Sequence, residues 1–186
     1  MECPPFPSRQ EVVIHAPLQV VWDVHQDVTN IAVSHSRVKR GELISGQRQR
    51  GNGGAYRCSL TDGKQTCVEK DLEVVPMERI VTAFPGDTMG IANMLPDYVV
   101  EARLTPVASN ETKVEFRHYY STRSLKTTYF NVIVKRKIAR DAQNTLETMK
   151  RTIEQHGSSS FERQKEHAAY DQDARSHSRT GDGSPA

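Results

Sequence analysis

Residues 12–30 read VVIHAPLQVVWDVHQDVTN, and this stretch places a short strand directly before a helix. Residues 10–15 are rich in β-branched side chains, which favours a strand. Pro17 follows at a position where a helix tolerates proline, in its first turn. The apolar face of that helix consists of Val20, Val21 and Val24. A second short helix is expected within residues 27–36, so one strand and two short helices open the fold.

Six more strands are expected downstream, because strand-forming runs of largely alternating apolar and polar residues lie there between turn signals. They span residues 38–45, 55–60, 65–75, 79–84, 98–105 and 111–120. Asp62-Gly63 lies between the second and third of these strands and favours a tight primed turn. A two-residue loop at that point pairs residues whose numbers sum to 125.

The last expected element is a long helix over about residues 128–156. Its apolar positions recur at three- and four-residue steps, at Val134, Ile138, Ala142, Thr145, Met149 and Ile153. Consecutive antiparallel strands with a helix packed on one face define an α+β domain. Because one helix cannot fill the interior of a curved sheet, a ligand cavity is expected between the two.

One folded domain accounts for the 186 residues. We expect it to span residues 10–156, with residues 1–9 as a loose arm that contains three prolines. Residues 157–186 contain no Val, Ile, Leu or Met, so we expect them to form a disordered tail.

The composition argues against several classes of function. A net charge of +2 does not indicate a nucleic-acid partner. No apolar run approaches 18 residues and the N-terminus lacks the apolar core of a secretion signal, so a cytoplasmic location is expected. Cys3, Cys58 and Cys67 lack the spacing of zinc ligands, and neither a metal nor another cofactor is expected. The basic run at residues 135–137 is interpreted as a solvated helix face rather than a membrane contact.

Four stretches of the chain resemble the START-like superfamily in their order and spacing. They are VVIHAPLQVVWDVHQDVTN (12–30), GGAYR (53–57), LEVVPMERIVTAF (72–84) and LPDYVVEARLTPV (95–107). The last resembles the Tyr-bearing sixth strand of the polyketide cyclase/dehydratase and lipid-transport branch. The resemblance implies a helix-grip fold, in which a seven-stranded curved antiparallel sheet wraps around a long C-terminal helix. It leaves the activity open, because this superfamily includes binders, carriers and enzymes.

Strand alternation separates the side chains that face the cavity from those that face outward. In the strand at residues 98–105 the inward set is Tyr98, Val100, Ala102 and Leu104. In the strand at residues 111–120 it is Val114, Phe116, His118 and Tyr120. The long helix would add Val134 and Ile138 to the same cavity wall.

The hairpin at residues 55–75 is sorted by the same reasoning. Leu72 and Val74 are expected to face inward, and because every second side chain of a strand lies on the same face, Val68 and Lys70 are expected to face inward as well. Because paired residues across the hairpin sum to 125, Arg57 lies opposite Val68, and Arg57 and Ser59 are therefore expected to face inward. The same pairing places Cys58 opposite Cys67, on the outer face. A one-residue bulge would instead turn Lys70 outward and bring Glu69 in. The two cysteines could form a cross-strand disulfide, or remain neighbouring thiols in a reducing compartment.

Two functions follow from these assignments. The first is binding of a small hydrophobic molecule or lipid, whose carboxylate, enolate or carbonyl would meet Arg57 and Lys70. The second, implied by the resemblance, is cyclase/dehydratase-like acid/base chemistry on a carbonyl substrate. Arg57 would then stabilise an oxyanion, and Tyr98 and His118 would transfer protons. The other predicted ligand contacts are Ser59, Val68, Leu72, Val100, Phe116, Tyr120, Val134 and Ile138.

Overall fold

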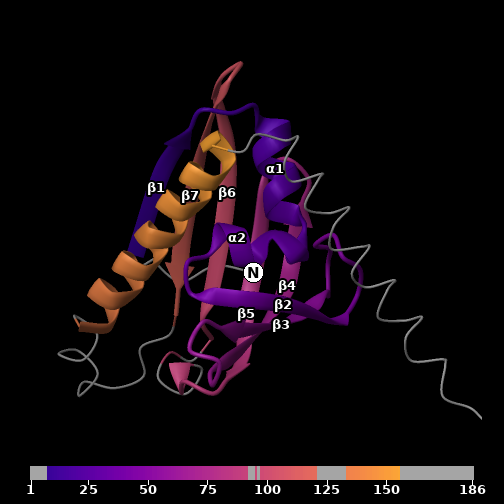
Figure 1. The fold of residues 1–186 in the computed structure, drawn as a ribbon, viewed down its shortest axis with the longest axis vertical. Coiled ribbons are helices and arrows are strands. Elements are labelled where there is room, and N and C mark those ends of the chain that lie inside the picture. Colours follow the sequence, from indigo (N-terminus) through magenta and orange to yellow (C-terminus); the bar gives the residue numbers. More distant parts are fainter. Residues whose placement is uncertain (1–7, 92–94, 96, 121–132, 156–186) are drawn as a thin grey trace, which may run out of the picture.

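Seven antiparallel strands form one sheet in the order β1-β7-β6-β5-β4-β3-β2 (Figure 1). They are β1 (Ser8–Ile14), β2 (Val38–Ser45), β3 (Ala55–Leu60), β4 (Thr66–Val75), β5 (Arg79–Asp87), β6 (Val99–Ala108) and β7 (Glu111–Tyr119). This computed structural model describes residues 8–91, 95, 97–120 and 133–155. The strand β1 begins two residues before the boundary expected from the sequence. Residues 1–7 of the expected arm and the whole expected tail lie outside the described residues.

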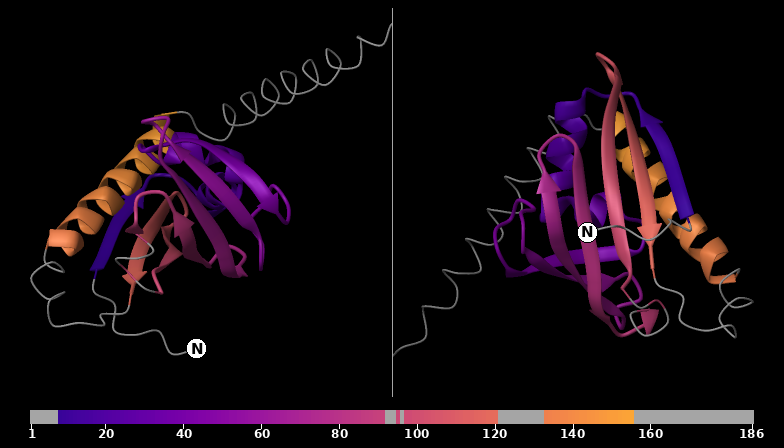
Figure 2. Two further views of the ribbon diagram at one scale, coloured as in Figure 1. Left: turned by 90° about the horizontal axis from the view of Figure 1, so that it is seen from below. Right: turned by 180° about the vertical axis from the view of Figure 1, so that it is seen from behind.

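The helices lie on one side of the sheet. The helix α1 (Leu18–Gln26), the 3-10 helix η1 (Val28–Asn30) and the helix α2 (Ile31–Ser34) connect β1 and β2, which are the two edges of the sheet. A long C-terminal helix, drawn in orange, spans residues 133–155 and crosses the same side (Figures 1 and 2). The predicted α+β helix-grip architecture is therefore confirmed.

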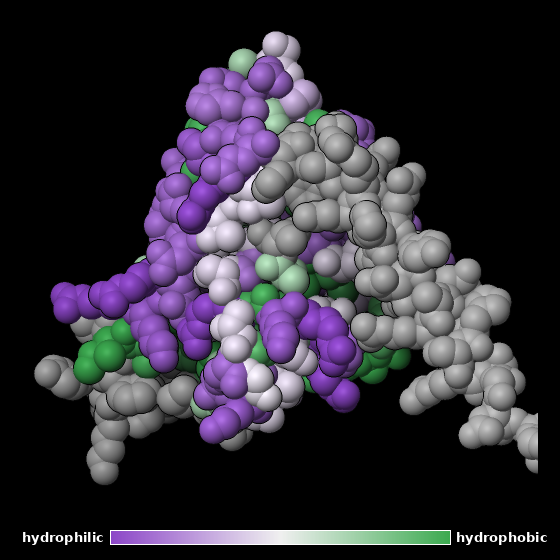
Figure 3. All heavy atoms as spheres, in the orientation of Figure 1, coloured by the Kyte–Doolittle hydropathy of each residue, from purple (hydrophilic) through white to green (hydrophobic). Residues whose placement is uncertain are grey.

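Two apolar clusters fill the space between the sheet and the helices. The larger joins α1 and the C-terminal helix to β1, β5, β6 and β7, and its most buried members include Ile14, Val21, Ile80, Val114 and Leu146. The smaller consists of Ile31, Val38, Cys58, Leu60 and Cys67. The outer face of the C-terminal helix is largely hydrophilic (Figure 3). The basic side chains of residues 135–137 are exposed. No helix among the described residues combines the length and apolarity needed to cross a membrane.

The hairpin of β3 and β4 has the predicted register. Arg57 pairs with Val68 and Cys58 pairs with Cys67, so the pairing sum of 125 is confirmed. The turn itself is not the predicted primed one, because only its glycine, Gly63, has a positive φ, of 70°. The carboxylate of Asp62 instead accepts hydrogen bonds from the backbone N–H groups of Lys64 and Gln65. The register is preserved because this longer loop remains centred on the same two residues.

A β-bulge in β4 reverses the predicted faces of that strand. Asp71 pairs with Thr82 and Glu73 with Val81, so one extra residue of β4, Leu72, lies between the two pairs. Leu72 is 43% exposed, whereas Asp71 is fully buried. The parity counted from Leu72 is therefore wrong for the rest of the hairpin. Cys67, Glu69 and Asp71 face inward from β4, and Tyr56, Cys58 and Leu60 face inward from β3.

Candidate functional site

A cavity of about 440 Å³ lies between the inner face of the sheet and the helices. Its walls include apolar side chains from α2, β5, β6, β7 and the C-terminal helix, among them Ile31, Phe84, Val100, Phe116, Val134 and Ile138. A volume of this size lies within the range of small-molecule sites in proteins. Six of the residues expected from the sequence to contact a ligand line this cavity: Tyr98, Val100, Phe116, His118, Val134 and Ile138.

The other predicted contacts do not line it. Five of them lie on the outer face of the β3–β4 hairpin: Arg57, Ser59, Val68, Lys70 and Leu72. Their sides were predicted by counting alternate residues from Leu72, and the bulge at Leu72 shifts that count by one residue. Arg57, Lys70 and Leu72 are exposed there. Tyr120 is buried with its ring 6.5 Å from that of Tyr98, outside the set of described residues that line the cavity.

Tyr98 and His118 form a hydrogen-bonded pair in the cavity wall. The Tyr98 hydroxyl lies 2.8 Å from His118 Nδ1, and the two rings are stacked with their centroids 6.0 Å apart. Burial lowers the pKa of His118 to about 4, so the imidazole is neutral at pH 7. Within the described part of the chain, His118 Nε2 is buried without a hydrogen bond. Because Nδ1 is engaged by Tyr98, Nε2 can serve a ligand as donor in one tautomer and as acceptor in the other.

A buried ion-pair cluster forms a second polar region of the cavity. Arg50 donates from Nη2 to Glu69 Oε2 (2.8 Å) and from Nη1 to Asp71 Oδ1 (2.9 Å). The Arg50 guanidinium carbon also lies 5.3 Å from the centre of the Tyr56 ring. Burial opposes ionisation of Glu69, but the charge and hydrogen bond of Arg50 hold its pKa below the usual value. The carboxylate of Glu69 is therefore ionised at neutral pH, and Arg50 neutralises its charge.

Arg50 was missed in the sequence because it belongs to the glycine-rich segment at residues 46–54, which shows no strand or helix periodicity. The sequence feature that could have indicated a buried cation is the pair of acidic residues Glu69 and Asp71, which lie two positions apart and therefore on one face of β4. Once both face inward, two buried carboxylates require a buried cation. Arg50 approaches them from the loop between β2 and β3, and its backbone N–H donates to the Gln26 carbonyl at the end of α1 (2.8 Å).

Two further histidines, His25 and His35, line the same cavity although the sequence offered no reason to group them. Desolvation is the main cause that lowers the pKa of His25 to about 3, and the charge of Arg50 acts in the same direction. Desolvation also lowers the pKa of His35. Both imidazoles are therefore neutral hydrogen-bonding groups at pH 7.

The comparisons with known proteins agree with this fold. A family model described as "Polyketide cyclase / dehydrase and lipid transport" matches residues 7–154. A search of curated proteins found no match. Among solved structures, the di-domain ARO/CYC BexL from the BE-7585A biosynthetic pathway has a TM-score of 0.65 and 16% identity. That alignment covers 79% of this chain and 46% of BexL, so the chain spans less than half of the di-domain protein.

Two further structures are similar over most of their own length. The Zhui aromatase/cyclase from Streptomyces sp. R1128 has a TM-score of 0.57 at 15% identity, with 77% of this chain and 91% of that one covered. A START superfamily protein from Mycobacterium smegmatis has a TM-score of 0.55 at 10% identity, with 78% and 92% covered. At these identities the similarity concerns the fold.

The buried position of Arg50 predicts a large difference between two arginine substitutions. Arg50→Met leaves Glu69 and Asp71 buried without their cation, and should lower the free energy of unfolding by about 3–5 kcal/mol. The matched change Arg57→Met on the exposed outer face should alter it by less than about 0.5 kcal/mol. Urea unfolding of the two variants measures both values. Equal effects would contradict the inward position of Arg50.

The neutral state of His118 predicts a loss of stability in acid. In the unfolded chain this histidine takes up a proton near its ordinary pKa of 6.5, whereas folded His118 resists protonation until about pH 4. Stability present at pH 7 is therefore lost as the pH falls through this window, by up to about 3 kcal/mol from this group.

Urea unfolding at pH 7 and at about pH 4.5 should accordingly show a smaller acid loss in His118→Gln than in the wild type. Each protein is compared with itself at the two pH values, so the effect of the substitution at pH 7 cancels. His25 contributes to the acid loss in both proteins and does not affect the comparison. An unchanged loss in His118→Gln would refute the assignment.

Proposed function

The chain belongs to the polyketide cyclase/dehydrase and lipid-transport family, and on this premise we propose that it binds a small, largely hydrophobic molecule in the cavity. The observation that carries the proposal is the cavity of about 440 Å³, whose walls combine apolar side chains with many polar ones. Apolar walls provide affinity by removing hydrophobic surface from water, and the polar groups orient the bound molecule.

The polar groups of the cavity favour a neutral ligand. Arg57 and Lys70, the cations expected to meet a carboxylate, lie on the outer face of the sheet. The charge of Arg50 is engaged by Glu69 and Asp71, and that of Arg37, which also lines the cavity, is engaged by Asp141 (2.7 Å). The exposed Lys137 also lines the cavity, but its ammonium group remains accessible to water. Tyr98 and neutral His118 suit a carbonyl or hydroxyl group better than an anion.

A second function, acid/base catalysis on a carbonyl substrate, is supported by the Tyr98–His118 pair. A hydroxyl and a neutral imidazole within hydrogen-bonding distance can together deliver a proton to one atom and remove one from another. Arg57 has no part in this version of the reaction, because its side chain is exposed on the other face of the sheet. An oxyanion would instead be stabilised by hydrogen bonds from His118 and Tyr98.

Ligand binding is tested with a neutral fluorescent probe, N-phenyl-1-naphthylamine, and two matched tryptophan substitutions. Val100→Trp fills the cavity and should weaken probe binding at least about tenfold, which corresponds to about 1.4 kcal/mol. Val68→Trp places the same side chain on the outer face and should change the affinity less than about twofold. Thermal unfolding confirms that both variants are folded.

Equal weakening by both substitutions, or by neither, would place the probe outside the cavity. If Val100→Trp does not fold, Ala142→Leu from the C-terminal helix tests the same space with a smaller side chain.

The polar pair is tested with two probes of similar shape, 2-acetylnaphthalene and 2-ethylnaphthalene. Tyr98→Phe should weaken binding of the ketone about three- to tenfold, because one hydrogen bond contributes about 0.5–1.5 kcal/mol. The hydrocarbon should bind both proteins equally. Isothermal titration calorimetry measures the four affinities, and equal losses for the two probes would exclude a specific carbonyl contact.

A further inference from the structure

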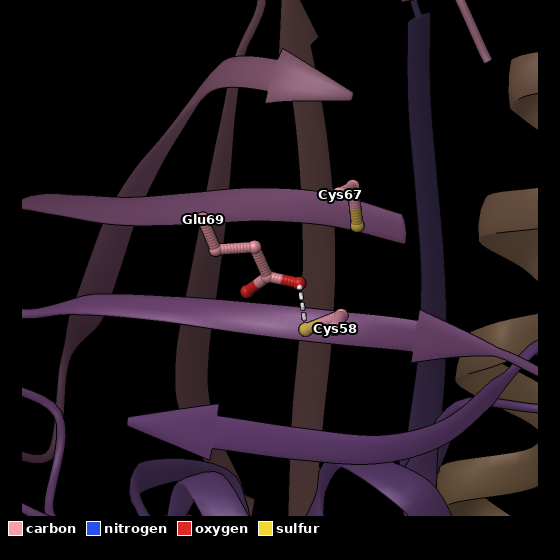
Figure 4. A group of neighbouring side chains, drawn as sticks. All are labelled: Cys58, Cys67 and Glu69. Carbon is pink, nitrogen blue, oxygen red and sulfur yellow. Dashed lines mark hydrogen bonds between the residues drawn. The ribbon is translucent and has the colours of Figure 1, made fainter. Parts of the chain in front are cut away.

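We propose that Cys58, Cys67 and Glu69 form a zinc site at the wall of the cavity. The two cysteines are directly opposite each other on β3 and β4, and Glu69 follows two residues after Cys67 on the same face. Figure 4 shows the three side chains pointing toward one another. Their sulfur and carboxylate oxygen atoms all lie within 4.8 Å of one another, and all three residues are buried.

These distances are close to those of a tetrahedral zinc site. Zinc binds thiolate sulfur at about 2.3 Å and carboxylate oxygen at about 2.0–2.2 Å, so neighbouring ligand atoms lie about 3.5–3.8 Å apart. The Cys58 sulfur is already 3.3 Å from Glu69 Oε1, to which its thiol donates a hydrogen bond. A zinc ion would replace this proton and that of the Cys67 thiol, both of which pass to water. The other two pairs of ligand atoms, which involve the Cys67 sulfur, need to approach each other by no more than about 1 Å.

Arg50 prepares Glu69 for this role. The guanidinium binds Glu69 Oε2, so Oε1 is the oxygen directed at the cysteines. A group that orients a metal ligand through its other polar atom is the usual second shell of a zinc site. Zinc, two thiolates, the Glu69 carboxylate and the Arg50 guanidinium together carry no net charge, which favours an ion at this buried point.

Glu69 distinguishes a metal site from two simpler explanations. The cysteines also pack with Ile31, Val38 and Leu60, which accounts for two small buried side chains. Neither this packing nor a disulfide requires an oxygen ligand beside the two sulfurs, whereas a zinc site does, and Glu69 Oε1, the oxygen not bound by Arg50, lies 3.3 Å from the Cys58 sulfur. The cysteines are unbridged in the structure. The site was not expected from the sequence, because pairing across the hairpin, rather than a Cys-x-x-Cys spacing, brings the ligands together.

Three protein ligands leave a fourth position for water or a ligand. Cys67 and Glu69 line the cavity, so this position opens onto it. A zinc ion there would polarise a carbonyl or lower the pKa of a bound water. Metal binding itself does not depend on the hydrophobic ligand proposed above.

Cadmium titration of the reduced, chelator-treated full chain tests the site. We expect one equivalent of Cd²⁺ to produce a thiolate-to-cadmium charge-transfer band in the absorption spectrum. Added Zn²⁺ should displace the bound Cd²⁺ and remove the band. Cys58→Ser and Cys67→Ser should each abolish the band, while Cys3→Ser, the matched control, should retain it. Glu69→Gln should weaken Zn²⁺ binding at least about tenfold, as for the loss of groups that support a metal site.

A second measurement uses the wild type alone and does not depend on the folding of any variant. Because Cys58 and Cys67 are buried, the rates of alkylation with and without the metal are compared, and Zn²⁺ should slow alkylation of these two residues, identified by mass spectrometry, at least about tenfold relative to the metal-free folded protein. Protection of neither residue, or a band that persists in both serine variants, would overturn the proposal. A disulfide between Cys58 and Cys67 that forms in air while the reduced protein binds no metal would overturn it as well.

Discussion

The ion pairs that the buried Arg50 guanidinium forms with Glu69 and Asp71 are the interactions on which the polar side of the cavity depends. Glu69 could not remain ionised inside the sheet without Arg50, because desolvation of an unpaired carboxylate is strongly unfavourable, and burial raises the pKa of Asp71 even with Arg50 beside it. The same contacts position the loop between β2 and β3. Gly53 donates a backbone hydrogen bond to Asp71 and Arg50 donates one to Gln26, so side-chain and backbone bonds together attach this loop to β4 and to the end of α1.

The architecture could be predicted from the sequence because its determinants are local. Alternation along residues 98–105 and 111–120 correctly placed Tyr98 and His118, since the irregularity in the pairing of β6 with β7 comes only between Pro106 and Ala108, beyond the residues that face the cavity. The register of β3 and β4 was predictable because it depends only on the centre of the turn, and both loop geometries share that centre. The faces of β4 were not predictable, because the extra residue at Leu72 is visible only in the pairing with β5.

The missed part of the candidate site depends on contacts between distant segments. Arg50 reaches Glu69 from a loop without periodicity, and His25 and His35 reach the cavity from separate helical segments. The two polar regions that result differ in kind. Tyr98 and His118 are neutral hydrogen-bonding groups, whereas the cluster around Arg50 is ionic and already paired within itself. This asymmetry gives the cavity a direction along which an amphipathic molecule would align.

The pairing of β1 with β7 has a consequence for how the protein folds. Ser8 pairs with His118 and Ile14 with Thr112, so the first of the seven described strands forms its hydrogen bonds with the last. Contacts this far apart in sequence require closure of a long loop, which slows folding. During synthesis on the ribosome, β1 therefore waits for most of the domain to emerge. The hairpin of β6 and β7, which pairs His118 with Val100, is local and needs no such closure, so β1 joins a hairpin that can form before it.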